Sequence, residues 1–276
     1  MNSQRVGIIG CGSIGDILSR YIEKGRAGDT ELSALLDSDT ESAFDLASDL
    51  DSNPDVYSNF PDMLDDESID ILIEAASQKA VWEYLLDSLR SGKDFVVLSV
   101  GAFADAEFRE KVRKVARDSG CYVYIPSGAI LGLDGIQAAS MAEVDRAILT
   151  TRKPATTLAR SKYVRERGID LSDLNGSKMI FEGTADQAVE AFPGSVNVAA
   201  ALSIAGIGFE ETQVRIVADQ SLEQNVHEIH VKGEAGEFMT RARNFPSPEN
   251  PKTSYLAALS AVRTLRDRTK SLLLGI

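Results

Sequence analysis

A Gly-x-Gly-x-x-Gly turn near the start of the chain constrains the fold more than any other feature. A predicted strand, Arg5 to Ile9, leads into Gly10-Cys11-Gly12-Ser13-Ile14-Gly15, and a helix-like segment follows. The first glycine allows a tight turn, the second lets backbone approach a pyrophosphate, and the third lets the helix pack closely on the strand. The helix N-terminus then presents unpaired N–H groups to phosphates. The turn therefore predicts a dinucleotide-binding unit.

An acidic residue at the end of the next predicted strand supports this interpretation. The strand Glu31 to Leu36 is followed by Asp37, which is 22 residues beyond Gly15. An offset of about 20 residues is typical of the acid that binds the adenine ribose hydroxyls. The carboxylate of Asp37 repels a 2′-phosphate, so we expect NAD as the cofactor, with NADP still possible. The predicted cofactor contacts are Gly10, Gly12, Ser13, Ile14, Gly15 and Asp37.

Helix-like segments alternate with short apolar runs through the first half of the chain. The runs are Glu31–Leu36, Ile69–Ile73, Phe95–Leu98 and Tyr122–Ile125. This alternation predicts an α/β fold with a Rossmann-type doubly wound parallel sheet. Ser38-x-x-Glu41 is typical of a capping box, and Gly92 and Gly120 stand where helices should end.

The pattern changes after Pro126-Ser127-Gly128. Longer strand-like runs follow at Glu143–Thr151, Lys178–Glu182, Gln213–Ala218, Asn225–Lys232 and Glu237–Ala242, and helical segments begin at Thr184-x-x-Gln187 and Asn197. These runs predict a second, mixed α+β substrate domain.

The end of the chain is predicted to be helical again. Apolar residues recur at three- and four-residue spacing from Leu256 to Leu272, after the proline-rich stretch 246–251. By analogy with other two-domain dehydrogenases, we expect this helix to return to the nucleotide domain. With about 100–200 residues per domain as a guide, the expected division is 1–126, 127–249 and 250–276.

The charge of the chain narrows the range of partners. The 276 residues include 42 acidic and 29 basic side chains, a net charge of −13. This excess opposes binding to nucleic acid or to anionic lipid, so neither is expected as a partner. A soluble protein that acts on small molecules fits this charge better. Either solubility alone or adaptation to a salty cytoplasm would explain the acidic excess.

Cysteine content and hydropathy favour a cytoplasmic protein. Cys11 and Cys121 are too few for a disulfide framework or a metal cluster, so no metal is expected. No apolar run approaches the ~18 residues of a membrane span.

Both histidines of the chain fall in one predicted strand. Asn225, His227, Ile229 and Val231 share one face, whereas Glu228, His230 and Lys232 share the other. His227 is therefore predicted to face covered space and His230 to face charged neighbours. His227 is either a hydrogen-bonded core residue or a general acid–base, because imidazole titrates near working pH.

Two further clusters follow the ends of predicted strands. Glu74-Ala75-Ala76-Ser77-Gln78 follows one strand, and Ser99 to Ala102 follows the next. Ligands of open α/β sheets bind beyond the carboxyl ends of the strands, so Ala76, Ser77 and Gln78 are candidate cofactor contacts. The alternative is that both are ordinary strand-to-helix turns.

Candidate substrate residues lie in the second domain. Arg152 and Lys153 end a predicted strand and offer cations to a charged substrate, although charged strand ends are often simply solvated. Asn225 shares the face of His227. Asn197 begins a helix whose N-terminus could receive a carboxylate or the nicotinamide, or it serves as the N-cap alone.

Taken in order, these segments resemble the L-aspartate dehydrogenase family. The matching segments are Gly10 to Gly15, Glu74 to Val81, Ser127 to Leu133, Thr151 to Pro154, Asn197 to Leu202, Asn225 to Ile229 and Asn250 to Tyr255. The pairing of Asn197-Val198-Ala199-Ala200-Ala201-Leu202 with Asn225-Val226-His227-Glu228-Ile229 is the most specific part. Gln220 departs from the family, which commonly has proline there.

The resemblance implies oxidation of L-aspartate by NAD or NADP to iminosuccinate, which hydrolyses to oxaloacetate and ammonia. It also implies that iminosuccinate can feed pyridine-nucleotide synthesis, and that the protein is a homodimer. It assigns His227 as the active-site histidine and Ala129 and Asn197 as contacts near the reactive end of the cofactor. The alternatives are another two-domain reductase, similar to homoserine dehydrogenase or dihydrodipicolinate reductase, and a sensor that binds NADH without turnover.

Overall fold

The computed structural model describes residues 3–193, 196–247 and 254–275. The chain divides into two compact units, one made of Met1–Gly128 with Ala257–Ile276 and the other of Ala129–Leu256. The expected boundary at 249/250 lies outside the described residues. The expected division at 126/127, with a cofactor role for the first part and a substrate role for the second, stays a prediction.

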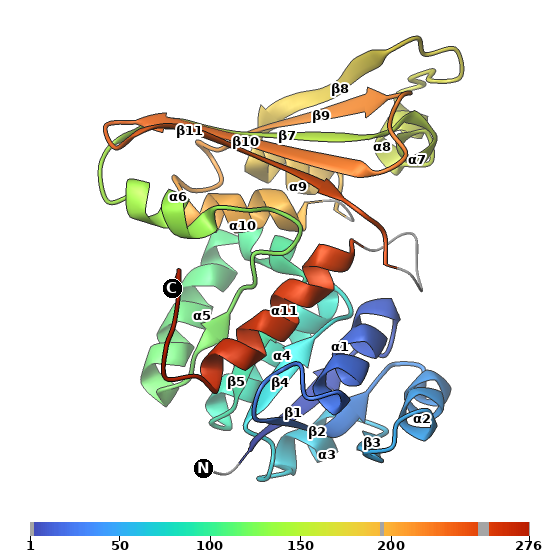
Figure 1. The fold of residues 1–276 in the computed structure, drawn as a ribbon, viewed down its shortest axis with the longest axis vertical. Helices are drawn as coiled ribbons and strands as arrows, with labels where there is room; N and C mark the ends of the chain where they lie inside the picture. The colour runs from blue at the N-terminus through green and yellow to red at the C-terminus, as the bar shows by residue number, and fades with distance from the viewer. Residues whose placement is uncertain (1–2, 194–195, 248–253, 276) are drawn as a thin grey trace. The chain divides into compact units, whose positions relative to one another are not determined.

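The first unit is built on a six-stranded sheet in which every pair of neighbouring strands is parallel (Figure 1). Its order is β3-β2-β1-β4-β5-β6, the order of a classic doubly wound sheet. The strands are β1 (Gln4–Ile9), β2 (Thr30–Leu36), β3 (Asp55–Tyr57), β4 (Ile71–Glu74), β5 (Asp94–Val97) and β6 (Val123–Tyr124). The predicted Rossmann-type sheet is confirmed, although β3 was not predicted.

The helices of this unit follow the strands, and the last comes from the C-terminal end of the chain. They are α1 (Ser13–Glu23), α2 (Thr40–Ser48), α3 (Phe60–Asp65), α4 (Gln78–Arg90), η1 (Val100–Ala104), α5 (Ala106–Ser119) and α11 (Tyr255–Arg268). Ala261, Val262 and Leu265 of α11 are buried in one core cluster with Val6 and Ile8 of β1. The C-terminal helix therefore contributes to the core of the first unit.

Two sequence predictions about helix ends are wrong. The predicted apolar stripe runs to Leu272, but α11 ends at Arg268 and Leu272 is 85% exposed. The backbone N–H of Thr269 donates to the carbonyl oxygen of Arg266, three residues earlier, and this 3₁₀-type bond closes the last turn. Ser38 does not cap α2, because its hydroxyl donates to Asp37 Oδ1 and the N-cap is Asp39.

Other predicted ends are confirmed. Gly120 is the C-cap of α5 with φ +70°, and Gly92 has φ +82° just after the C-cap of α4. Glycine adopts these angles without the steric cost that other residues bear.

The second unit carries a five-stranded mixed sheet in the order β11-β10-β7-β9-β8. The strands are β7 (Val144–Pro154), β8 (Ser177–Thr184), β9 (Gln213–Asp219), β10 (Asn225–Gly233) and β11 (Gly236–Asn244). Only the β7–β9 pair is parallel. The predicted mixed α+β architecture is confirmed.

Helices cover one face of this second sheet. They include α6 (Leu133–Ala139), α9 (Ala185–Ala191) and α10 (Asn197–Ala205), which Figure 1 shows along the same side, whereas the short helices α7 (Ala155–Leu158) and α8 (Lys162–Glu166) lie at one end. In β7, Ala147, Leu149, Thr151 and Lys153 are buried, and the residues between them are partly exposed. The alternation therefore separates a covered face from an open face.

No helix among the described residues is both long and apolar enough to cross a membrane.

Candidate active site

The glycine turn has the shape that a dinucleotide requires. A side chain at Gly10, which has φ +102°, would meet the carbonyl oxygen of Ala75 at 2.7 Å, and one at Gly15 would collide with the carbonyl of Gly10. A Cβ at Gly12, in contrast, would meet nothing within 4 Å. The turn is therefore closed on its inner side and open at its middle glycine, where a pyrophosphate can approach backbone.

The start of α1 carries a buried polar atom that fits the same ligand. The hydroxyl oxygen of Ser13 is buried and has no hydrogen-bond partner among the described residues. A buried hydroxyl without a partner costs free energy, which a bound phosphate oxygen would recover. The residues present at this turn fit a dinucleotide.

Asp37 is fixed against the glycine turn. Its Oδ2 accepts the backbone N–H of Cys11 at 2.6 Å, and its Oδ1 accepts that of Asp39 at 2.9 Å. Oδ1 also accepts the Ser38 hydroxyl, whereas Oδ2 has a lone pair left to accept a ribose hydroxyl. Burial, followed by the charge of Asp37, raises the pKa of the Cys11 thiol to about 12, so this thiol stays protonated.

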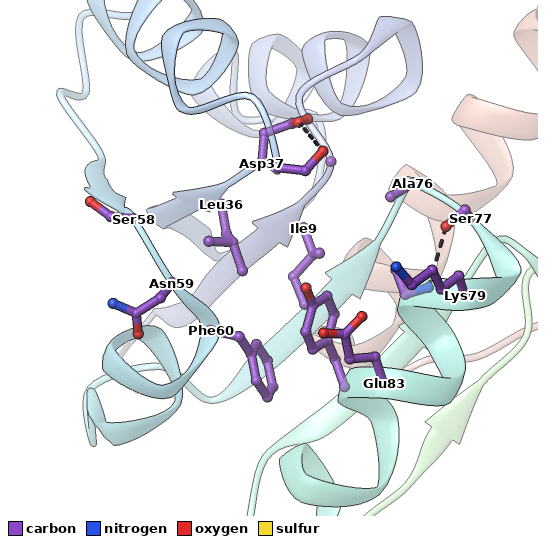
Figure 2. Close-up of a pocket in the computed structure, with 14 residues that line it drawn as sticks. Ile9, Leu36, Asp37, Ser58, Asn59, Phe60, Ala76, Ser77, Lys79 and Glu83 are labelled. Carbon is purple, nitrogen blue, oxygen red and sulfur yellow. Dashed lines mark hydrogen bonds between the residues drawn. The ribbon is translucent and has the colours of Figure 1, made fainter.

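A pocket of about 270 Å³ opens beside Asp37 (Figure 2). Its lining comes from the ends of β1 and β2, from residues 58–60 and from the first turns of α4. The rings of Phe60 and Tyr84 stack in its wall with centroids 4.3 Å apart. Ala76 and Ser77 also line the pocket, whereas Gln78 is not among its lining residues.

A buried carboxylate organises the neighbouring loops. Glu74, fully buried at the end of β4, accepts hydrogen bonds from Ala76 N at 2.8 Å and Ser99 Oγ at 2.7 Å through Oε1. Its Oε2 accepts those of Ser99 N at 2.9 Å and Leu98 N at 3.2 Å. Burial raises the pKa of Glu74, while these bonds act in the opposite direction. Glu74 thus joins the two loops that were predicted as ligand-binding clusters.

In the second unit, a buried histidine lies on the covered face of the sheet. His227 of β10 pairs with Thr151 of β7, and its Nδ1 lies 3.0 Å from Thr151 Oγ1. His227 is 6% exposed, as its strand pattern predicted. Burial, followed by the positive charge of Lys153, lowers the pKa of the imidazole to about 4.

Lys153 supplies a cation on the same face. It stands two residues after Thr151 in β7 and is 8% exposed. Burial alone lowers the pKa of this ammonium to about 8. The positive charge of this side chain would attract an anionic substrate group on the same face.

The neighbouring Arg152 lies on the opposite face. Its Nε is 3.1 Å from Glu228 Oε2, and its Nη1 is 3.8 Å from Asp219 Oδ2. The structure therefore does not bring Arg152 together with His227. His230 also lies on the open face, 2.6 Å from Glu237, as the strand pattern predicted.

The remaining predicted contacts take separate places in the second unit. Asn225 begins β10 on the face of His227, half-buried. The carbonyl of Ala129 accepts a bond from Asn244 Nδ2 at 2.9 Å, and both residues are buried. Asn197 is the exposed first residue of α10 rather than its N-cap, which is Val196.

Sequence analysis did not single out Thr151, whose hydroxyl lies beside the ring of His227. The contact of Thr151 with His227 depends on the register between β7 and β10. Strand alternation places Thr151 and Lys153 on the same face of β7. The pairing of β7 with β10 is needed to show that His227 lies beside Thr151 on that face.

Comparisons with known families match both units. The family described as "Aspartate dehydrogenase, C-terminal" matches residues 134–268, and the family described as "Homoserine dehydrogenase, NAD binding domain" matches residues 10–126.

Curated relatives match almost the whole chain. An L-aspartate dehydrogenase of Methanosarcina mazei is 50% identical over 262 residues, covering 95% of this chain and 96% of its own. Another L-aspartate dehydrogenase, from Nitrosopumilus maritimus, is 36% identical with the same coverage of both chains.

Solved structures agree at the level of the fold. The aspartate dehydrogenase of Thermotoga maritima matches with a TM-score of 0.79 and 28% identity, covering 99% of each chain. A homoserine dehydrogenase of Thiobacillus denitrificans, at 16% identity and a TM-score of 0.60, covers 97% of this chain and 73% of its own and shares the fold alone.

Proposed function

The chain belongs to the L-aspartate dehydrogenase family, and we propose that it oxidises L-aspartate with His227 as its acid–base residue. The enzyme is an NAD(P)-dependent oxidoreductase that acts on the CH–NH₂ group of its substrate. The observation that carries the proposed role of His227 is its burial beside Thr151 and Lys153 on one face of the second sheet.

Different residues of the first unit bind different parts of the cofactor. The open middle of the turn at Gly12 and the unpaired hydroxyl of Ser13 receive the pyrophosphate. The pocket beside Asp37 takes the adenosine part, with the Asp37 carboxylate accepting the ribose hydroxyls. When bound, the nicotinamide supplies a hydride acceptor. Glu74 fixes the two loops at the ends of β4 and β5.

The residues of the second unit act on the substrate. The α-ammonium of aspartate must lose a proton before the C–N double bond can form, and His227 is uncharged at neutral pH because its pKa is lowered. An uncharged imidazole has a lone pair that can accept that proton, and a substrate carboxylate beside Lys153 would offset the charge that weakens the base. Lys153 binds a substrate carboxylate, with Asn225 beside it on the same face. Arg152 does not take this role because its guanidinium forms ion pairs with Asp219 and Glu228 on the opposite face.

The test is an assay of NAD reduction, followed by the absorbance of NADH, with aspartate, homoserine and hydroxy acids in parallel. Aspartate-dependent NADH formation is expected. Reduction with homoserine and not with aspartate would favour the alternative reductase. NADH binding without turnover of any of these substrates would indicate a sensor.

We also propose that the protein is a homodimer that pairs through the open face of the second sheet. Met179 and Met239, which lie on that face by strand register, are 48% and 71% exposed. Contact with a second copy of the chain would remove the apolar surface of these side chains from water, which stabilises a dimer by roughly 25 cal/mol per Å² buried. Sedimentation equilibrium of Met239→Glu beside the parent chain tests this, because a monomeric parent would refute it.

Two expectations about cellular role complete the proposal. We expect a cytoplasmic enzyme, which fractionation of cells would test. We further expect its iminosuccinate to feed pyridine-nucleotide synthesis, so cells that lack the gene should need more of an external pyridine precursor.

A further inference from the structure

The contact between His227 and Thr151 joins two buried polar side chains on the covered face of the second sheet. The two residues are direct cross-strand partners, and Nδ1 lies 3.0 Å from Oγ1. Thr151 is 3% and His227 is 6% exposed, so bulk water has little access to either. The threonine side chain is β-branched and therefore stiff about χ1. The partner of Nδ1 is fixed by two adjacent strands.

This contact has two possible arrangements with different chemical consequences. A neutral imidazole carries one N–H, on Nδ1 or on Nε2. If the hydroxyl donates to Nδ1, then Nε2 carries the hydrogen and cannot accept another proton. If Nδ1–H donates to the hydroxyl oxygen, Nε2 keeps a free lone pair. Only the second arrangement survives when Nε2 takes up a proton, because Nδ1 remains a donor.

We propose that Thr151 is a positioning residue whose Oγ1 accepts a hydrogen bond from Nδ1–H of His227 and so selects the tautomer with a basic Nε2. This inference rests on the proposed function, in which His227 accepts the proton of the substrate. An N–H bond of the aspartate ammonium then breaks, and an N–H bond to Nε2 forms with the imidazole lone pair. The hydroxyl stabilises the resulting imidazolium by continuing to accept from Nδ1.

The surroundings of the ring agree with this assignment. Strands β7, β9, β10 and β11 bring residues to this face within two positions of the pair. Of these residues, Lys153 is the charged one. Its field and the burial of the ring disfavour the imidazolium before substrate arrives. A dicarboxylate substrate beside Lys153 would offset that charge, so the ring becomes a stronger base when its substrate is bound.

The experiment compares Thr151→Val, which keeps the shape and removes the hydroxyl, with Thr151→Ser, which keeps the hydroxyl. We expect Thr151→Val to lower kcat/KM for aspartate by about 10- to 100-fold, less than the roughly 10²–10⁴-fold that the acid–base group itself contributes. NADH affinity should be unchanged in both variants, and Thr151→Ser should recover most of the activity.

Nitrogen-15 NMR of the imidazole supplies a readout that does not depend on turnover. The chain has two histidines, so His230→Gln assigns their signals. We expect Nδ1 of His227 to be protonated and Nε2 unprotonated in the parent and in Thr151→Ser, with the tautomer changed in Thr151→Val.

Full activity of Thr151→Val, or a parent spectrum with the hydrogen on Nε2, would overturn the inference. If Thr151→Val fails to fold, the protonation of Nδ1 in the spectra of the parent and of Thr151→Ser still tests the inference. His227→Ala separates the two proposals, because full activity of that variant would remove the proposed role of His227. An inactive His227→Ala together with a fully active Thr151→Val would remove only the role of Thr151.

Discussion

The two units build their polar sites in different ways. In the first unit, the buried carboxylate of Glu74 is surrounded by four donors from nearby loops, and Asp37 is fixed by backbone N–H groups. In the second unit, His227 has one hydroxyl partner in Thr151 and a cation, Lys153, whose charge opposes its protonation. The first arrangement surrounds its carboxylates with donors, whereas the second places a cation close enough to an imidazole to lower its pKa.

The candidate site of the first unit depends on loops that hydrogen bonds hold in place. The candidate site of the second unit depends on the register between paired strands. The donors around Glu74 make the loops rigid, so changes there should affect folding and cofactor binding together. The face of His227 depends on strand pairing, so conservative changes there should affect chemistry more than stability.

The largest expected effect on stability is its dependence on pH. Folded His227 has a pKa of about 4, while the unfolded imidazole titrates at 6.5. As pH falls from 6.5 to 4, the unfolded state takes up a proton that the folded state resists, so stability falls. The loss approaches about 3 kcal/mol. Urea unfolding of the parent and His227→Gln across this window measures it, and parallel stability curves for the two would contradict it.

The second prediction sharpens the contrast between Lys153 and its neighbour. Lys153→Met should lower kcat/KM for aspartate by about 10- to 100-fold, because a charged hydrogen bond contributes roughly 1.5–3 kcal/mol. Arg152→Met is the matched control, since that side chain lies on the open face in ion pairs. Steady-state kinetics decide, and equal losses in both variants would break the distinction between the two faces.

The third prediction concerns Glu74. Glu74→Gln is isosteric but turns an amide NH₂ toward N–H donors, so we expect a loss of about 1–3 kcal/mol in the free energy of unfolding. Weaker NADH binding should accompany it. Glu107→Gln, on the exposed start of α5, serves as the control. An unchanged Tm and an unchanged Kd for NADH would show that Glu74 does not organise the loops.

The smallest expected effect concerns cofactor choice. Asp37→Asn keeps the shape of the side chain and removes the charge that would face a 2′-phosphate. The NAD preference in kcat/KM should fall roughly five- to tenfold, because like charges about 4 Å apart repel by about 1 kcal/mol even in bulk water. Comparable use of NAD and NADP by the parent would show that Asp37 does not set the preference.

Local patterns predicted most of the fold. The glycine turn, Asp37 and the alternating apolar runs sufficed for the parallel sheet, because these signals are contiguous in the chain. β3 was missed because its three residues, Asp55–Tyr57, are too few to show a period. The departure at Gln220 has a physical reason, since its backbone N–H donates to Gly176 O at 3.0 Å and proline lacks that hydrogen.

The candidate site was only partly predictable. The period of two separated His227 from His230 correctly, since each strand residue alternates sides. The same rule separates Arg152 from Lys153, yet both were predicted as substrate residues because the face of their strand was unassigned. Thr151 required the register between two strands that lie more than seventy residues apart in the chain, about which a single sequence carries no local signal.

The most direct test of the central claim is to measure turnover and NADH affinity together in His227→Ala. The account predicts a loss of aspartate oxidation of at least about 10²–10⁴-fold, as for a removed acid–base group, with NADH affinity nearly unchanged. His230→Ala, on the open face, should keep the parent's activity. Turnover by His227→Ala at the parent's rate would contradict the account.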